Sequence, residues 1–245
     1  MTPEKAGFGE QAINKIAEMA LASQLKEVEQ LEVQVKSDLS KLAHGEVDFI
    51  AINVNDIVMQ QNLGVEKLQI EINHVSVKPL SALFGKIQLT KPSEGTARIV
   101  INEDNLNRAL NSENLKKNLH NMHVFFDNKR VAIALQQVKC CLLDNGNIAF
   151  NSELILDKTG EATCAFTATP CIGTNGEKIV FQDVNYREGK ELPPELTATL
   201  LAQVSEVLSL RSFEQKGITL RFQRLDVAAG KLTLQAAAYI EQFPS

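Results

Sequence analysis

Histidine and cysteine are the residue types in this chain that most readily hold a metal ion or activate a nucleophile. The histidines are His44, His74, His120 and His123. His120 and His123 are three residues apart, so on a helix they could share one face and bind a metal ion. Asn121 and Met122 separate them, however, and no acidic or cysteine ligands cluster nearby. We therefore predict no metal site and no cofactor.

The cysteines are too few and too unevenly spaced for a secreted disulfide scaffold. They are Cys140, Cys141, Cys164 and Cys171. Adjacent residues of a strand point to opposite faces, so Cys140 and Cys141 would not lie together. This pattern predicts reduced, structural thiols in a cytoplasmic protein.

Motifs of the common catalytic classes are missing from the sequence. There is no glycine-rich phosphate loop, and no serine lies in a Gly-x-Ser-x-Gly turn. The neighbouring carboxylates Glu103 and Asp104 are typical of the first turn of a helix, where acids favour the helix dipole. We predict no catalytic residue. An enzyme remains an alternative, because catalytic residues can come together from distant positions.

Composition and charge argue against a nucleic-acid partner. The chain has 25 Lys and Arg against 30 Asp and Glu, for a net charge of -5, with 5% aromatic residues and no Trp. It therefore offers neither a basic surface nor stacking platforms for bases. The first ten residues show no apolar signal segment, and no stretch approaches about 18 apolar residues. We expect a cytoplasmic protein.

Hydrophobic periodicity predicts a chain dominated by strands. An amphipathic helix is expected over 9–26, and a second long helix begins at Pro193 and Pro194. Asn102 is expected to cap a short helix that ends at Leu110, and another helical turn is expected over 113–119. Alternating residues predict strands at 31–36, 47–58, 68–77, 86–91, 96–101, 122–126, 131–143, 148–156, 162–168, 178–186, 218–227 and 232–240. Phase slips at Asn73 and His74, and between Leu135 and Val138, predict bulges.

Long strands with few helices imply a particular architecture. A strand of about twelve residues is about 40 Å long, and two helices cannot cover one face of a sheet built from such strands. The sheet must therefore curl on itself or wrap around a helix. We predict an α+β, mainly β fold, with a strongly curved antiparallel sheet on two long helices. The expected organisation is a tail over 1–8 and one domain over 9–245.

A curled sheet lined by medium aliphatic side chains can enclose an elongated apolar cavity. Such a cavity suits an acyl chain, because one buried methylene contributes about 0.8 kcal/mol. A filled sandwich core is the alternative. The predicted lining residues are Ile50, Ile52, Val54, Leu68, Ile70, Ile72, Ile99, Ile133, Leu135, Phe150, Leu154, Phe166, Leu220 and Phe222.

The segment 78–86 connects two predicted strands, yet it carries apolar residues where a turn is normally polar. Leu80, Leu83 and Phe84 lie between Lys78 and Lys86. The lysines could face anionic head groups while the apolar side chains enter the membrane interface. We predict membrane contact here, and the alternative is a cap on one end of the core.

Several segments resemble the LmeA-like bacterial phospholipid-binding family. The run 42–48, with Gly45, Val47 and Asp48, is similar to the strand start of that family, and 101–110 is similar to its strand-to-helix step. The segments 192–196 and 217–222, together with the Gly230 hairpin, resemble its C-terminal helix and closing strands. The resemblance extends from about residue 12 to residue 240.

This resemblance implies a tubular lipid-binding (TULIP-like) fold that binds or transfers a phospholipid or another acyl-chain lipid without catalysis. It also implies peripheral contact with a membrane, on the inner face for a cytoplasmic chain. A scaffold with a filled core that recruits a protein partner is the first alternative. An enzyme acting on an apolar substrate is the second.

Overall fold

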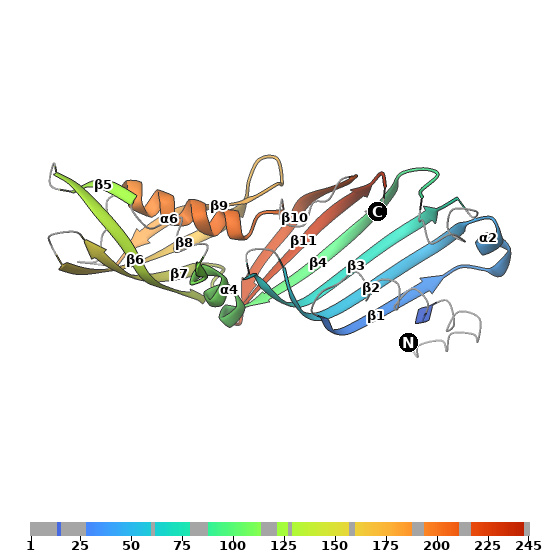
Figure 1. Ribbon diagram of the computed structural model, residues 1–245, viewed down its shortest axis with the longest axis horizontal. Coiled ribbons are helices and arrows are strands. Elements are labelled where there is room, and N and C mark those ends of the chain that lie inside the picture. Colours follow the sequence, from blue (N-terminus) through green and yellow to red (C-terminus); the bar gives the residue numbers. More distant parts are fainter. Residues whose placement is uncertain are drawn as a thin grey trace.

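A computed structural model describes residues 14–15, 28–59, 62–78, 88–113, 122–126, 129–156, 160–187, 194–210 and 217–242. Within these ranges the strands form two antiparallel sheets, one of six strands and one of five. The sheets follow one another along the long axis of the molecule, with helix α4 at their junction (Figure 1).

The six-stranded sheet combines strands from both ends of the chain. Alternating apolar and polar residues form its strands, which is typical of antiparallel sheets with one covered face. In spatial order the strands are β1 (Val28–Lys36), β2 (Glu46–Val58), β3 (Gly64–Ser76), β4 (Ser93–Asn102), β11 (Lys231–Ile240) and β10 (Ile218–Ala228). The helical turn α2 (Leu39–Ala43) joins β1 to β2.

The five-stranded sheet is a meander in which each strand pairs with the next along the chain. Its strands are β5 (Met122–Phe126), β6 (Lys129–Leu142), β7 (Ile148–Leu156), β8 (Gly160–Ile172) and β9 (Ile179–Tyr186). Helix α6 (Pro194–Val207) follows β9 and lies along this sheet (Figure 1). Its Leu196, Leu200 and Val204 are buried.

Helix α4 (Glu103–Leu110) joins the two sheets. The Oδ1 of Asn102 caps it by accepting a hydrogen bond from Asn105 N at 2.8 Å, as predicted. Its Leu106, Ala109 and Leu110 are fully buried. They belong to a hydrophobic core that includes residues of both sheets, so the core continues through the junction.

Turns between strands make further contacts from one sheet to the other. The Phe222 N of β10 donates to Gly176 O at 2.7 Å, and Arg221 pairs with Glu177 at 3.2 Å. Ala229 N donates to an Asp144 carboxylate oxygen at 2.7 Å. These contacts tie the β8–β9 and β6–β7 turns to the β10–β11 hairpin.

The structure corrects the expected architecture in part. The fold is mainly β, as predicted, but the strands form two sheets rather than one, and neither sheet closes on itself. Strong curvature therefore stays a prediction. The 14-residue helix α6 corresponds to the predicted C-terminal helix. The predicted helix over 9–26 lies outside the described residues except at Asn14 and Lys15.

The predicted phase slips have different structural origins. In β6 the pairing with β7 shifts between Leu135 and Gln137, which confirms the predicted bulge. At His74 the backbone has a positive φ of 52°, and the buried phase moves from Ile72 to Val75. The pairing of β3 with β2 nevertheless keeps one register through this point, so a local twist of the chain, not an inserted residue, causes the slip.

Candidate functional site

One face of the six-stranded sheet is apolar on every strand. Rows of directly paired residues cross the sheet and place aliphatic, aromatic or small side chains on the same side. We call this surface the apolar sheet face. Its rows are Leu31–Val54–Leu68–Ile99–Leu234–Leu225, Val33–Ile52–Ile70–Ala97–Ala236–Phe222 and Val35–Ile50–Ile72–Gly95–Ala238–Leu220.

The opposite face of the same sheet is polar. Gln69 Nε2 donates to Asn53 Oδ1 at 3.1 Å, and Arg98 donates to Gln69 Oε1 at 3.3 Å. Asn55 donates to Gln30 Oε1 at 3.1 Å on the neighbouring strands. These side chains satisfy one another beside solvent, so the sheet has one wet face and one face suited to apolar contacts.

Burial changes across the apolar sheet face. Ile99, Leu234 and Ala236 are buried at 2%, 2% and 1% exposure, whereas the middle of β2 and β3 is only half-buried. Leu31 and Val35 of β1 and Leu225 of β10 are half-buried as well. We call the half-buried part that lies on β2 and β3 the β2–β3 patch, and it consists of Ile50, Ile52, Leu68 and Ile70. A contiguous aliphatic surface that is only partly covered has hydrophobic free energy still to gain from a bound apolar molecule.

Side chains are smallest along the middle of this face. Gly95 and Ala97 of β4 pair with Ala238 and Ala236 of β11. A Cβ at Gly95 would lie 2.7 Å from Glu71 O, so the close approach of the neighbouring strand requires glycine there. The larger side chains of β3 and β10 flank this strip, which gives the face a low centre and higher sides.

The structure divides the predicted lining residues between the two sheets. On the apolar sheet face lie Ile50, Ile52, Val54, Leu68, Ile70, Ile72, Ile99, Leu220 and Phe222. On one face of the five-stranded sheet, the pairings place Ile133, Leu135, Phe150, Leu154 and Phe166. The side chains of Ile133 and Leu135 lie outside what the structure describes.

The face of the five-stranded sheet that carries Phe150 is packed with aromatic rings. The ring of Phe150 stacks on Phe166 with centroids 5.1 Å apart, and Phe181 meets Phe150 edge-on at 5.9 Å. Phe150 is completely buried, and Leu154 and Phe166 are buried to 3% exposure. These side chains therefore fill the space between this sheet and α6 and stabilise the fold.

A pocket of about 500 Å³ lies between β9 and α6, and sequence reasoning missed it. Phe181, Val184 and Tyr186 line it from the strand. The helix contributes the small residues Ala198 and Ala202, four positions apart, together with the buried Leu201. The two alanines at helical spacing were the available sequence signal.

Comparison with known proteins decides the family. A family model described as LmeA-like phospholipid-binding matches residues 5–237. The chain belongs to the LmeA-like phospholipid-binding family. The match confirms the resemblance seen in the sequence and supports lipid binding. Neither the curated proteins nor the solved structures contain a match to this chain.

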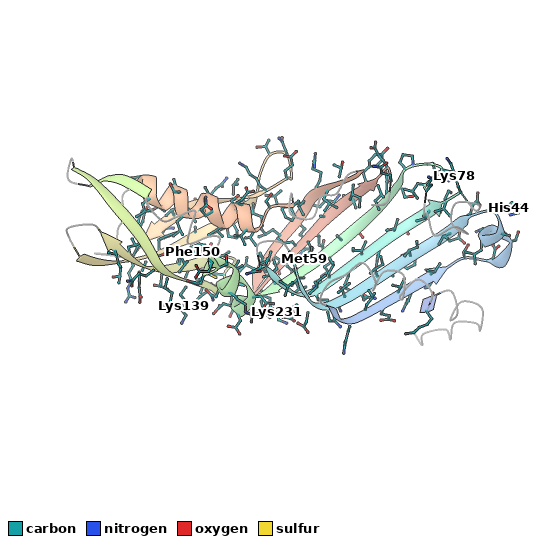
Figure 2. All side chains as sticks on the ribbon, in the orientation of Figure 1. His44, Met59, Lys78, Lys139, Phe150 and Lys231 are labelled. Atoms are coloured by element: carbon teal, nitrogen blue, oxygen red, sulfur yellow. The ribbon has the colours of Figure 1, made fainter. Side chains whose placement is uncertain are left out.

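The segment predicted to contact a membrane in this LmeA-like chain begins at one end of the six-stranded sheet. Of the predicted membrane-contact residues, the structure describes Lys78, which is exposed, whereas Leu80, Leu83, Phe84 and Lys86 lie outside the described residues. Val77 N donates to Gly45 O at 2.8 Å, which brings this connection beside the β1–β2 turn. Figure 2 shows His44 and Lys78 at the same end of the molecule, far from the five-stranded sheet.

Burial favours the neutral form of three thiols in this LmeA-like chain, those of Cys140, Cys141 and Cys164. Burial raises the pKa of Cys140 and of Cys164 to about 12, and desolvation also raises that of Cys141. Because the thiolate is the nucleophile and the metal ligand, neutral thiols are inert.

Among the described residues, no cluster of three histidine, cysteine or acidic side chains could hold a metal ion. No helix in the described ranges has the length and apolarity needed to cross a membrane.

Proposed function

We propose that this chain binds a phospholipid without catalysis and transfers it, with the acyl chains lying against the apolar sheet face. Membership of the phospholipid-binding family supports a lipid ligand. The β2–β3 patch carries the proposal, because its four neighbouring aliphatic residues are half-buried on a continuous apolar surface, while the other face of the sheet is polar.

The dimensions of the sheet fit this ligand. Strands β2 and β3 have 13 residues each, which corresponds to about 43 Å of extended chain. The acyl layer of one membrane leaflet is about 15 Å deep, half the hydrocarbon core of a bilayer. The face is therefore long enough for acyl chains to lie along it at full length. Each methylene withdrawn from water contributes about 0.8 kcal/mol.

The predicted lining residues of both sheets enter this proposal in different roles. The half-buried aliphatic residues of β2 and β3 contact the lipid. Buried positions such as Val54, Ile72 and Ile99 support them from the same rows. The aromatic residues of the five-stranded sheet hold the second sheet and α6 together.

Contact with the membrane is proposed at the end of the sheet where Lys78 lies. The exposed ammonium of Lys78 could face anionic lipid head groups there. The apolar residues predicted to enter the interface, Leu83 and Phe84 among them, follow directly along the chain. A lipid could then pass from the membrane onto the adjacent apolar sheet face.

A pair of double substitutions tests the lipid site. Ile52 and Ile70 are directly paired on the apolar sheet face, and Asn53 and Gln69 are paired on the polar face of the same strands. We expect Ile52→Ser with Ile70→Ser to lower phospholipid affinity by more than tenfold, because the two substitutions remove about six aliphatic carbons from the contact surface and each methylene buried against lipid contributes about 0.8 kcal/mol. Native mass spectrometry of the purified chain measures the bound lipid.

The matched control is Asn53→Ser with Gln69→Ser, which should retain the lipid. Thermal unfolding of both variants shows whether each is folded. Equal lipid loading of two folded variants would contradict the proposal. A wild-type chain that carries no lipid but co-elutes with a protein would favour a scaffold instead.

A further inference from the structure

The pocket between β9 and α6 is elongated, and a hydrogen bond between the strand and the helix lies at each end of it. The hydroxyl of Ser205 donates to Ile179 O, and the Tyr186 hydroxyl bonds to Thr197 Oγ1 at 2.6 Å. The start of the strand therefore lies beside the end of the helix, and the end of the strand beside its beginning. The pocket runs along both elements between these two contacts.

Small helix residues keep this space open. Helix α6 turns Leu196, Leu200 and Val204 into the core, where they are buried. Its pocket side presents Ala198 and Ala202, which are exposed. Methyl groups facing the larger side chains of β9 leave a mainly apolar groove, open to solvent, between the helix and the strand, which we call the channel.

The length of the channel fits one hydrocarbon chain. From Pro194 to Ser205 the helix rises about 17 Å, at 1.5 Å per residue. The acyl layer of a membrane leaflet is about 15 Å deep, so a single acyl chain has a matching length. The volume of about 500 Å³ lies in the range of small-molecule sites.

The charge at one end indicates the polar group of the ligand. Lys178 lines the pocket beside Ser205 and is exposed. The neighbouring acid, Glu177, is paired with Arg221, and no carboxylate among the described residues forms an ion pair with Lys178. A cation at one end of an apolar channel complements an anion at one end of an apolar chain.

We propose that this pocket is a second lipid site, separate from the apolar sheet face, that binds one long-chain fatty carboxylate. The carboxylate pairs with Lys178, and the hydrocarbon chain runs between Phe181 and Val184 on one side and Ala198 and Ala202 on the other. Its far end lies near the Tyr186–Thr197 hydroxyl pair. The proposal does not depend on the sheet face binding phospholipid.

Filling the channel tests the site. The probe is cis-parinaric acid, a fluorescent long-chain fatty acid, titrated into the full chain. We expect Ala202→Phe to weaken its binding by more than tenfold, because the new ring would occupy the space of the hydrocarbon chain. The matched control is Gln203→Phe, which adds the same ring at the next position of the helix, outside the pocket lining. It should bind the probe like the wild type.

Removing the charge tests the position of the carboxylate. We expect Lys178→Gln to weaken the probe about threefold, as for an exposed ion pair, and Lys178→Arg to restore it. The methyl ester of the same fatty acid should bind the wild type and Lys178→Gln equally.

Two results would overturn the second site. One is a folded Ala202→Phe variant that binds the probe like the wild type, while Ile52→Ser with Ile70→Ser loses it, since the fatty acid would then occupy the sheet face. The other is displacement of the probe by a two-chain phospholipid as readily as by free fatty acid. If the sheet face binds no phospholipid but Ala202→Phe still weakens the probe, the proposed function is wrong and the fatty-acid site is supported.

Discussion

Asn107 and Asn111 let a helix take the place of a strand beside β6. Asn107 Nδ2 donates to Cys140 O at 2.9 Å, and its Oδ1 accepts from Cys140 N at 2.8 Å. Asn111 makes the same pair of bonds with Val138, with Val138 N donating to its Oδ1 at 3.1 Å. The primary amide of asparagine therefore reproduces the donor and acceptor of a backbone peptide. An otherwise open strand edge is thereby satisfied.

These amides should matter for stability. We expect Asn107→Ala or Asn111→Ala to lower the free energy of unfolding by about 1–3 kcal/mol, because each leaves an N–H and a C=O of β6 without partners. Urea unfolding followed by circular dichroism measures the change. Arg108→Ala, an exposed position of the same helix, is the control and should change the stability by less than about 0.5 kcal/mol. An equal loss in all these variants would show that the amide bonds contribute nothing specific.

Sequence reasoning at the residue scale succeeded where the signal is local. The cap at Asn102 and the buried stripe of Leu106, Ala109 and Leu110 were predicted and are confirmed. The roles of Asn107 and Asn111 were not predicted. A polar residue on a helix normally faces water, and its partner strand lies 27 to 33 residues further along the chain. No residue near Asn107 or Asn111 in the sequence indicates that they bond to a strand so far along the chain.

At the scale of elements, strands were easier to predict than their partners. The bounds of β5 and β7 agree with the prediction, because each has turn residues on both sides. Strand β8 was expected over 162–168 but extends over Gly160–Ile172. Proline is unusual inside a strand, so Pro170 indicated an earlier end in the sequence. The strand nevertheless continues through it, and Pro170 lies opposite Phe181.

The pairing of β4 with β11 explains why one sheet was expected instead of two. Asn102 lies opposite Lys231, so the partners are far apart in sequence. Turn signals identify only hairpin neighbours, which form the whole meander β5–β9 and the β10–β11 hairpin. When a strand pairs with a partner far along the chain, as β4 does with β11, no residue nearby in the sequence indicates the sheet to which it belongs. The expectation of a single domain stays a prediction.

The segment 78–86 gives a prediction for one element. We expect Leu83→Ser with Phe84→Ser to lower binding to vesicles containing an anionic phospholipid by more than tenfold, since each large apolar side chain contributes about 1.5–3 kcal/mol when buried in the interface. Vesicle co-sedimentation measures the binding. The matched control is Val58→Ser, which alters an exposed apolar residue at the opposite end of β2. Unchanged vesicle binding of the double variant would show that the segment caps the core instead.

At the scale of the whole molecule, the apolar faces of the two sheets differ in how far they are buried. The apolar face of the five-stranded sheet packs aromatic rings against α6, and a pocket lies between β9 and that helix. On the six-stranded sheet, the apolar face is buried over β4 and β11, whereas Ile50, Ile52, Leu68 and Ile70 of β2 and β3 are half-buried. Both sheets thus contribute to a common core at the junction, and the six-stranded sheet retains the half-buried apolar surface on which we propose that lipid binds.

The lipid-binding role could be predicted from the sequence in outline but not in position. The alternating aliphatic residues of β2, β3 and β4 identify an apolar face, and the register shows that the predicted residues of these strands share it. Which part of the face is open depends on the segments packed over it, which periodicity alone does not report. The sequence therefore predicted Ile52 and Phe150 as equivalent, although Ile52 is half-buried and Phe150 is completely enclosed.

Photo-crosslinking with a phospholipid that carries a diazirine within its acyl chain tests the central claim most directly. The loaded chain is irradiated and digested, and the lipid-bearing peptides are identified by mass spectrometry. We expect adducts on the peptides of β2 and β3 that contain Ile50, Ile52, Leu68 and Ile70. Adducts restricted to other parts of the chain, with none on these two strands, would contradict the account.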